Sequence, residues 1–271
     1  MGRPLWYVEL VKKTFPSRFF LARLTHVPII GKIVHVMIFH DINMVYLPQN
    51  KVIKVGKTVE DSGSTILPSQ VVEHFVEQAN YHWIMNFCIC RSASKCEDYP
   101  KELGCLFLGE AVLKINPELG RQVKKEEALR HLKKCEEANL VHLVGKDKFD
   151  TMWLNIGPGE KLLTICNCCP CCCLWRMLTH VSPKIMPKVT KLPGVSVRVT
   201  ETCIGCGKCT SSNVCFVNAI KMINKKAVIT EECKGCGRCV NICPQNAIEI
   251  SYNEESVEKT IDRMELLVDV T

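Results

Sequence analysis

No long apolar run occurs in this sequence: nowhere do about eighteen uncharged apolar residues follow one another, so no transmembrane helix is expected. The N-terminus also lacks an apolar stretch that ends in a small-residue cleavage site, so we expect no signal peptide and a cytoplasmic location. The Gly-x-Gly-x-x-Gly fingerprint of flavin and nicotinamide sites is missing. No motif that reads a nucleic-acid groove is present either, which argues against a nucleic-acid partner.

Cysteine, by contrast, is abundant, with 19 residues in a chain of 271. So many thiols without an export signal favour metal binding over disulfides. Because oxygen attacks exposed thiolates, we expect an anaerobic host. The net charge of +7 is uneven, since residues 201–271 contain eight Lys and Arg against ten Asp and Glu. The basic remainder of the chain could meet an acidic redox partner or a membrane surface.

Two cysteine runs near the C-terminus have the spacing of loops that bind iron–sulfur clusters. The first has Cys203, Cys206 and Cys209 followed by Cys215, and the second has Cys233, Cys236 and Cys239 followed by Cys243. Three thiolates at two-residue spacing can surround one face of a [4Fe–4S] cube if glycines let the loop curl tightly. Zinc sites use pairs of cysteines and do not require the third. The pattern predicts two cubes close together, and hence one-electron transfer.

From residue 194 to residue 251 the sequence resembles a bacterial two-cluster ferredoxin. Each run ends with a similar six-residue sequence, Cys215–Ile220 in the first and Cys243–Ile248 in the second, which indicates an internal repeat. In such ferredoxins the fourth ligand of each cluster comes from the other run. The resemblance therefore implies one cluster on Cys203, Cys206, Cys209 and Cys243, and another on Cys215, Cys233, Cys236 and Cys239.

Two further cysteine groups lie in the middle of the chain, with Cys135 alone between them. Adjacent cysteines point in different directions, so these thiols cannot all serve one cube, but they can line a pocket or serve two centres. We expect a further iron–sulfur centre. The candidate ligands are Cys88, Cys90, Cys96, Cys105, Cys166, Cys168, Cys169 and Cys171. Zinc and a redox-active dithiol site are the alternatives.

Apolar strands are expected before both groups, at 81–87 and at 161–165, which would mount the cysteines on rigid supports. Between the groups, apolar spacing predicts a helix over 124–138 and a strand over 140–144 that bring them together. Cys135 would then be a core residue on the helix.

Four segments together resemble an uncharacterised group of iron–sulfur proteins from anaerobes. They are the Cys-x-Cys-Arg segment Cys88–Arg91, Glu126–Leu129, Leu140–His142, and Ile165–Cys173 with its Ile-Cys-Asn-Cys-Cys-x-Cys-Cys-Cys pattern. The resemblance covers residues 70–271 and implies the architecture without a known reaction. The arginine of the first segment would either pair with an anion or be a solvated surface residue.

The first forty residues contain six Lys and Arg, several aromatic residues and one acid, Glu9. Such a basic amphipathic segment can lie at a membrane interface, or it can pack on the body or on a partner. We therefore expect an α+β protein with a docking segment at 1–60, a cysteine-rich α/β body at 65–180, a small ferredoxin-like domain at 194–251 and a helix at 252–271.

The leading functional hypothesis is an electron-transfer protein or redox subunit, rather than a stand-alone enzyme, with a redox protein as its partner and peripheral membrane contact as a further expectation. One alternative is a reductase whose ferredoxin domain feeds a cysteine-rich substrate site. Another is a protein that handles metals or clusters, because consecutive cysteines bind soft metals readily.

Overall fold

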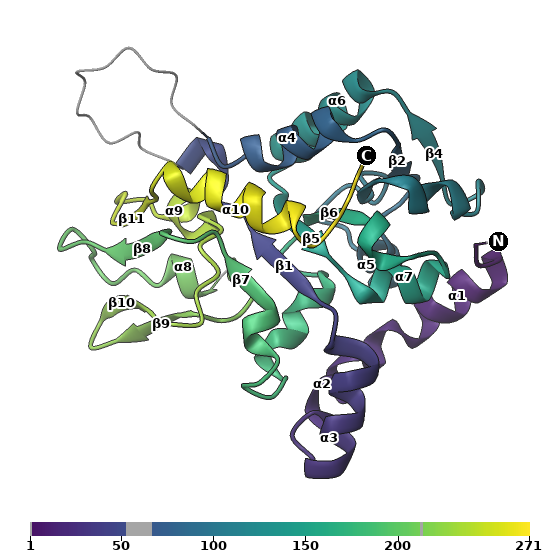
Figure 1. Ribbon diagram of the computed structural model, residues 1–271. Coiled ribbons are helices and arrows are strands. Elements are labelled where there is room, and N and C mark those ends of the chain that lie inside the picture. Colours follow the sequence, from purple (N-terminus) through teal and green to yellow (C-terminus); the bar gives the residue numbers. More distant parts are fainter. Residues whose placement is uncertain (1, 53–66, 212–213) are drawn as a thin grey trace.

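A seven-stranded sheet forms the centre of the computed structural model, which describes residues 2–52, 67–211 and 214–271 (Figure 1). The strands lie in the order β4–β2–β3–β6–β5–β1–β7. They are β1 (Asn43–Tyr46), β2 (His82–Met85), β3 (Leu106–Leu108), β4 (Gly120–Val123), β5 (Val141–Lys146), β6 (Leu163–Cys168) and β7 (Val189–Lys191). Neighbours pair antiparallel, except that β7 runs parallel to β1. The fold is α+β, as the sequence predicted.

Three helices cover one face of this sheet: α4 (Gln70–Gln78), α6 (Lys125–Glu137) and α10 (Glu255–Glu265). Phe75 and Met264 from these helices pack with strand residues such as Leu106 in one core cluster. The helices that apolar spacing predicts over 124–138 and after Tyr252 are present as α6 and α10. Since α10 follows the C-terminal domain yet packs on α4, the end of the chain belongs to the core of the body.

Shorter elements cover the opposite face, and the cysteine segments lie among them. They include α5 (Ile89–Ala93), α7 (Lys148–Leu154) and the 3-10 helix η6 (Leu174–Thr179). Trp175 is the largest buried side chain there and packs with Met44 and Leu143 of the sheet. Further short turns are η3 (Asn50–Val52), η4 (Glu110–Lys114), η5 (Gly159–Lys161) and η7 (Met186–Lys188).

The N-terminal residues form a string of helices, of which two project from the body (Figure 1). They are α1 (Leu5–Thr14), η1 (Phe15–Ser17), α2 (Arg18–Leu24), α3 (Pro28–Val34) and the π-helical η2 (His35–Phe39). No helix in the described part of the chain is both long enough and apolar enough to cross a bilayer. Within the segment 1–60, residues Asn43–Tyr46 form the buried strand β1 of the central sheet; the predicted end of this segment at residue 60 lies outside the described residues.

The C-terminal module, residues 194–251, contains two strand pairs and two short helices. The strand β8 (Ser196–Val199) pairs with β11 (Ile248–Ser251), and β9 (Ile220–Ile223) pairs with β10 (Lys226–Ile229). The helices are α8 (Lys208–Ser211) and α9 (Arg238–Ile242). The preceding stretch 180–194 contains η7 and β7. A strand of the central sheet therefore ties the module to the body.

Candidate metal centres

Two cavities of the module are each lined by four cysteines. One is lined by Cys203, Cys206, Cys209 and Cys243, and the other by Cys215, Cys233, Cys236 and Cys239. Each set takes three thiols from one loop and the fourth from the other repeat, because α8 and α9 lie against each other. The structure thus brings together the two sets that the ferredoxin resemblance implies.

The module loops fit a cluster in their backbone as well as in their thiols. Gly205 and Gly235 have φ values of +71° and +63°, a conformation that glycine adopts without strain. The amides of Ala219 and Ala247 both donate hydrogen bonds at 3.2 Å, to Cys215 Sγ and Cys243 Sγ respectively. This repeated contact suits charged sulfurs, since hydrogen bonds to sulfur are a usual support of thiolate ligands.

Burial keeps the inner thiols of the module neutral in the absence of a bound metal. Desolvation raises the pKa of Cys236 to about 12, so this sulfur stays protonated at neutral pH unless a metal replaces the proton. Soft thiolates in sets of four are the ligands that iron–sulfur clusters require. The residues present therefore fit such a group.

The body cysteines divide into two centres, one of which is compact. Cys96, Cys169, Cys171 and Cys172, here called the closed quartet, have Sγ atoms that all lie within 4.8 Å of one another. Cys171 Sγ is 3.6 Å from Cys96 Sγ and 3.5 Å from Cys172 Sγ. Three of the four were sequence candidates. Cys172 was missed because nothing in the run of consecutive cysteines says which of them face the same way.

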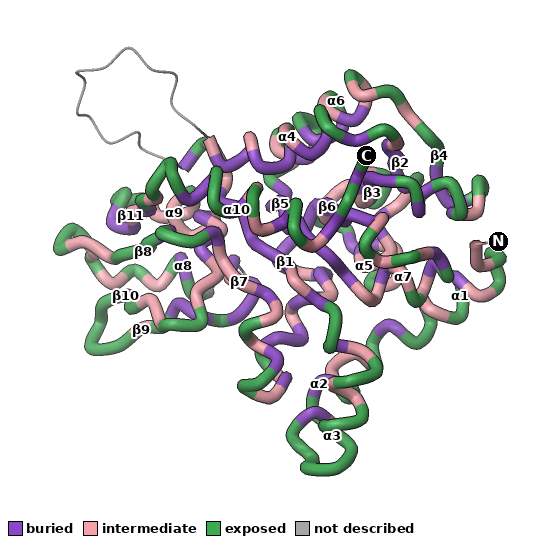
Figure 2. The backbone as a smooth tube through the Cα atoms, viewed as in Figure 1, coloured by how far each residue is buried: buried purple, intermediate pink, exposed green. Residues whose placement is uncertain are grey.

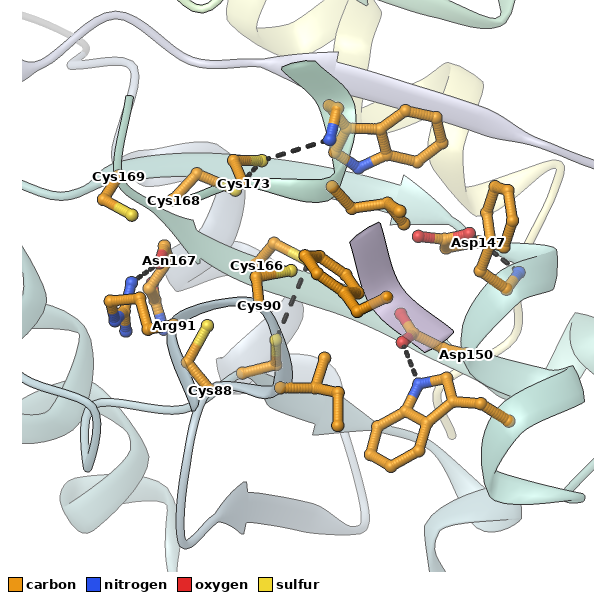
Figure 3. A pocket seen from close by; sticks show the side chains of 17 residues that line it. Cys88, Cys90, Arg91, Asp147, Asp150, Cys166, Asn167, Cys168, Cys169 and Cys173 are labelled. Carbon is orange, nitrogen blue, oxygen red and sulfur yellow. Dashed lines mark hydrogen bonds between the residues drawn. The ribbon is translucent and has the colours of Figure 1, made fainter. Parts of the chain in front are cut away.

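Six of the other seven body thiols, all except Cys135, line a cavity of about 110 Å³, here called the thiol cavity (Figure 3). They are Cys88, Cys90, Cys105, Cys166, Cys168 and Cys173. Cys105 Sγ lies 3.8 Å from Cys166 Sγ, and Cys173 Sγ lies 3.3 Å from Cys168 Sγ. Five of the six were sequence candidates, so the predicted set of eight spans both body centres. Cys173 was missed, and Cys169 borders the thiol cavity as well as belonging to the quartet.

Aromatic side chains form the rest of the cavity wall, including Phe149, Trp153 and Trp175. A hydrogen bond from Cys90, together with the charge of Arg91, lowers the pKa of Cys88 to about 7. This thiol is therefore partly ionised at neutral pH, while its partner Cys90 has a raised pKa. Such a pair can bind a soft metal or act as a nucleophile.

Two buried carboxyl groups, Asp147 and Asp150, lie on the side of the cavity away from Arg91 (Figure 3). Desolvation raises the pKa of Asp150 to about 6, against the opposing hydrogen bonds from Trp153 Nε1 and Thr164 Oγ1 at 2.8 and 2.9 Å. Burial, and then the charge of Asp150, raise the pKa of Asp147 as well. No sequence pattern singles out these acids, because their burial depends on how α7 packs against the sheet.

Arg91 is fully buried, so the expectation of a solvated surface arginine is wrong. Its guanidinium donates to the main-chain carbonyls of Pro100 at 2.8 Å, Asn167 at 2.7 Å and Leu103. Burial acts to lower the pKa of this guanidinium, but the charges of the nearby Cys88 and Cys169 thiols outweigh burial and raise it. Arg91 thus joins the two cysteine segments. Cys135 is buried as predicted, with its Sγ 3.7 Å from His131 Nε2.

Two rings belong to the same core cluster as cysteines of the second module cavity and of the thiol cavity. Tyr46 and Phe216 have centroids 5.3 Å apart, and both share a core cluster with Cys168, Cys173 and the module cysteines Cys215 and Cys236. The Tyr46 hydroxyl and the Trp175 indole nitrogen are buried, and neither has a hydrogen-bond partner among the described residues. Orphan polar atoms are rare in folded proteins and often mark the place of a bound group.

Comparison with known families supports the assignment of the module. A family described as the LdpA Fe-S cluster-binding domain matches residues 211–253, which include five of the eight module cysteines. Neither the curated proteins nor the solved structures contain a match to this chain. The four-cysteine cavities and this match define an iron–sulfur domain. The chain is accordingly an iron–sulfur protein.

Proposed function

We propose that this chain is an electron-transfer protein or redox subunit that carries two [4Fe–4S] clusters in its module and a further cluster in the thiol cavity. When bound, such clusters supply one-electron oxidation and reduction. The observation that carries the proposal is the core cluster in which the neighbouring rings of Tyr46 and Phe216 lie together with cysteines of both the second module cavity and the thiol cavity. Electrons from a redox partner would enter at the exposed Cys206 loop of the first module cavity and leave by way of the body.

The residues of the body support a buried relay. The thiol cavity offers six soft ligands, of which a cube needs four. Its aromatic walls would keep water from the cluster and so hold its potential constant. The orphan indole nitrogen of Trp175 could donate to a cluster sulfur, as such donors tune potential.

A reductase is the second candidate, and the acids of the thiol cavity favour it. A disulfide substrate needs two electrons and two protons to become two thiols. Asp150, with a pKa near neutrality, lies in the same cavity as six cysteines and could supply one of the protons. On this reading the module clusters feed electrons singly to a substrate held beside Cys88 and Cys90.

Iron and acid-labile sulfide analysis of the full chain, prepared without oxygen, tests the proposal together with EPR of the reduced protein. We expect about twelve irons per chain and signals from interacting clusters. About eight irons would leave the thiol cavity without a cluster. A colourless preparation without labile sulfide would overturn the proposal entirely.

A double variant, Cys168→Ser with Cys173→Ser, separates the two candidates. Under either hypothesis this variant keeps its module clusters, so the module EPR signals should persist. A carrier should lose the extra iron yet still reduce a generic acceptor through its module, whereas a reductase should lose substrate turnover. Cys135→Ala is the matched control, because Cys135 is also buried but does not line the thiol cavity and is not one of the closed quartet.

A further inference from the structure

We propose that the closed quartet, Cys96, Cys169, Cys171 and Cys172, binds a single zinc ion in a site distinct from the iron–sulfur clusters. This site goes beyond the proposed electron transfer and does not depend on it. It also reassigns three cysteines that the sequence offered as ligands of one extra cluster.

The spacing of the sulfurs carries the proposal. Zinc–thiolate bonds of about 2.3 Å in a tetrahedron place the sulfurs about 3.8 Å apart. Two sulfur–sulfur distances of the quartet, 3.6 Å from Cys96 to Cys171 and 3.5 Å from Cys171 to Cys172, are close to this value. In a cube each thiolate binds a different iron, so its four sulfurs must stand farther apart than four ligands of one ion.

The module cysteines provide an internal comparison. All eight module cysteines lie in the described residues, yet in neither set of four do all the Sγ atoms lie within 4.8 Å of one another. Among the described residues, the quartet is the one group of potential metal ligands that meets this limit. The thiol cavity contains two close pairs of sulfurs, Cys168–Cys173 and Cys105–Cys166, but no three of its described thiols lie within 4.8 Å of one another. The same chain therefore contains two kinds of thiol spacing, one suited to a cube and one to a single ion.

The surroundings of the quartet suit a closed structural site. Cys96, Cys169 and Cys172 are buried, and they pack with Cys135 and Leu140 in a small apolar cluster. Four thiolates fill the tetrahedron and leave no open position for substrate. Zinc with four thiolates has a net charge of −2, which the nearby guanidinium of Arg91 partly balances.

The position of the quartet gives the ion a structural role. Cys96 follows α5, while Cys169, Cys171 and Cys172 follow β6, so the ion would fasten two segments about 75 residues apart in sequence. Cys168 and Cys173, which flank the second segment, belong to the thiol cavity. The ion would therefore hold one wall of that cavity in place.

Metal analysis of the full chain with X-ray absorption at the zinc edge tests the site. We expect one zinc per chain, four sulfur neighbours at about 2.3 Å and no nearby iron. Cys96→Ser should lose the zinc and keep the iron, while Cys135→Ala should keep both. If Cys96→Ser does not fold, cobalt exchanged into the wild-type protein should give the charge-transfer bands of four-thiolate coordination. Absence of zinc, or iron in its place, would overturn the assignment.

A different observation, the projecting α2–α3 hairpin, leads us to infer that an anionic membrane surface covers this part of the protein. Figure 2 shows α3 almost entirely in the exposed colour. Phe20 of α2 is 62% exposed, Ile29 of α3 is 75% exposed, and Met37 of the adjoining η2 is 62% exposed. Ile30, Ile33 and Val36 extend the same patch. Monomeric proteins seldom expose so many neighbouring apolar side chains without a partner.

The charges around the patch indicate lipid as that partner. No acidic residue occurs between positions 10 and 40, whereas Arg23 and Lys32 lie exposed on the hairpin. At its base, the ammonium groups of Lys148 and Lys188 donate to the carbonyls of Val36 and His40 at 3.3 and 3.1 Å. An apolar tip above a basic base is the arrangement by which interfacial helices bind anionic bilayers.

Co-sedimentation of the full chain with vesicles tests this second inference. We expect binding to phosphatidylglycerol vesicles, weaker binding to pure phosphatidylcholine, and at least a tenfold loss of binding in Ile29→Asp. Leu266→Asp is the control, because Leu266 is 88% exposed but lies after α10, away from the hairpin. Binding that Ile29→Asp leaves intact would overturn the inference. The inference would also be overturned if the protein did not bind vesicles and instead formed a dimer, by analytical ultracentrifugation, that Ile29→Asp disrupts.

Discussion

Arg91 donates a hydrogen bond to the main-chain carbonyl of Asn167 at 2.7 Å, and this contact links the two cysteine segments of the body. Asn167 lies in β6 between Cys166 and Cys168, while Arg91 follows Cys90 in α5. The buried guanidinium satisfies carbonyls from both segments, which would otherwise be desolvated without a partner. The arginine of the Cys-x-Cys-Arg motif is therefore a positioning residue for both body centres.

Replacement of Arg91 should destabilise the whole body. In Arg91→Met the buried carbonyl of Asn167 and the half-buried carbonyls of Pro100 and Leu103 lose their donor, so we expect the free energy of unfolding to fall by about 3 kcal/mol. Urea unfolding under anaerobic conditions, followed by circular dichroism, measures this change. Arg198→Met is the control, since Arg198 pairs with Glu249 on an exposed strand and should cost less than about 1 kcal/mol. Equal losses in both variants would contradict the role of Arg91.

The crossed arrangement of module cysteines can be tested by pairs of variants. Cys243→Ser should weaken the same EPR signal as Cys203→Ser, although Cys243 is much nearer in sequence to Cys239. Cys215→Ser should in turn match Cys236→Ser. The reason is that each cavity takes its fourth thiol from the other repeat. Matching spectra for Cys243→Ser and Cys239→Ser would show that each run holds its own cluster instead.

Two neighbouring glycines should differ sharply in their tolerance of a side chain. Gly205 and Gly207 both have a φ of +71°, but a Cβ at Gly205 would lie 2.0 Å from the carbonyl oxygen of Lys225, whereas at Gly207 the nearest atom is 3.8 Å away. Gly205→Ala should therefore prevent assembly of the first module cluster. Gly207→Ala should cost only the backbone strain, about 1 kcal/mol. Iron content after anaerobic reconstitution compares them, and a full complement in Gly205→Ala would rule out this loop geometry.

The pKa of Asp150 makes stability depend on pH. Burial raises this pKa from 3.8 to about 6, so the carboxyl favours the folded state while it is protonated. This contribution is complete below pH 3.8 and is lost as the pH rises through 6. Asp150→Asn should remove this loss of stability at high pH, because an amide does not ionise. Its oxygen can still accept the hydrogen bond from Trp153 Nε1, and its nitrogen can donate to the Thr164 hydroxyl, which turns to accept. We expect the variant to be more stable at pH 8, by about 1 to 3 kcal/mol.

The pH profile of the melting temperature measures this effect. The gain of Asp150→Asn over wild type should shrink as the pH falls from 8 to 5.5, because the wild-type carboxyl then regains its proton. A gain that is the same at both pH values would mean that Asp150 is ionised throughout. Glu160→Gln serves as an exposed control; its pKa is lowered, so it should show no such gain at high pH.

Local periodicity was enough to predict much of the secondary structure. The helix expected over 124–138 is α6, and the strands expected over 140–144 and 161–165 are β5 and β6. These elements are long and have one clear apolar pattern. The strands β1 and β7 were not foreseen, since one lay within an apolar run that also suits an interfacial helix and the other within a stretch rich in proline.

The cysteine spacing by itself determined that this chain has a module built for iron–sulfur clusters, because three thiols at two-residue intervals are brought together by one local loop. Only the tertiary structure divided the ten cysteines of the two body groups into the closed quartet and the thiol cavity. It also decided that Arg91 is buried and that Asp147 and Asp150 border the cavity. The reason is physical. Spacing fixes how thiols meet within a loop, but which thiols meet across the sheet depends on how distant segments pack.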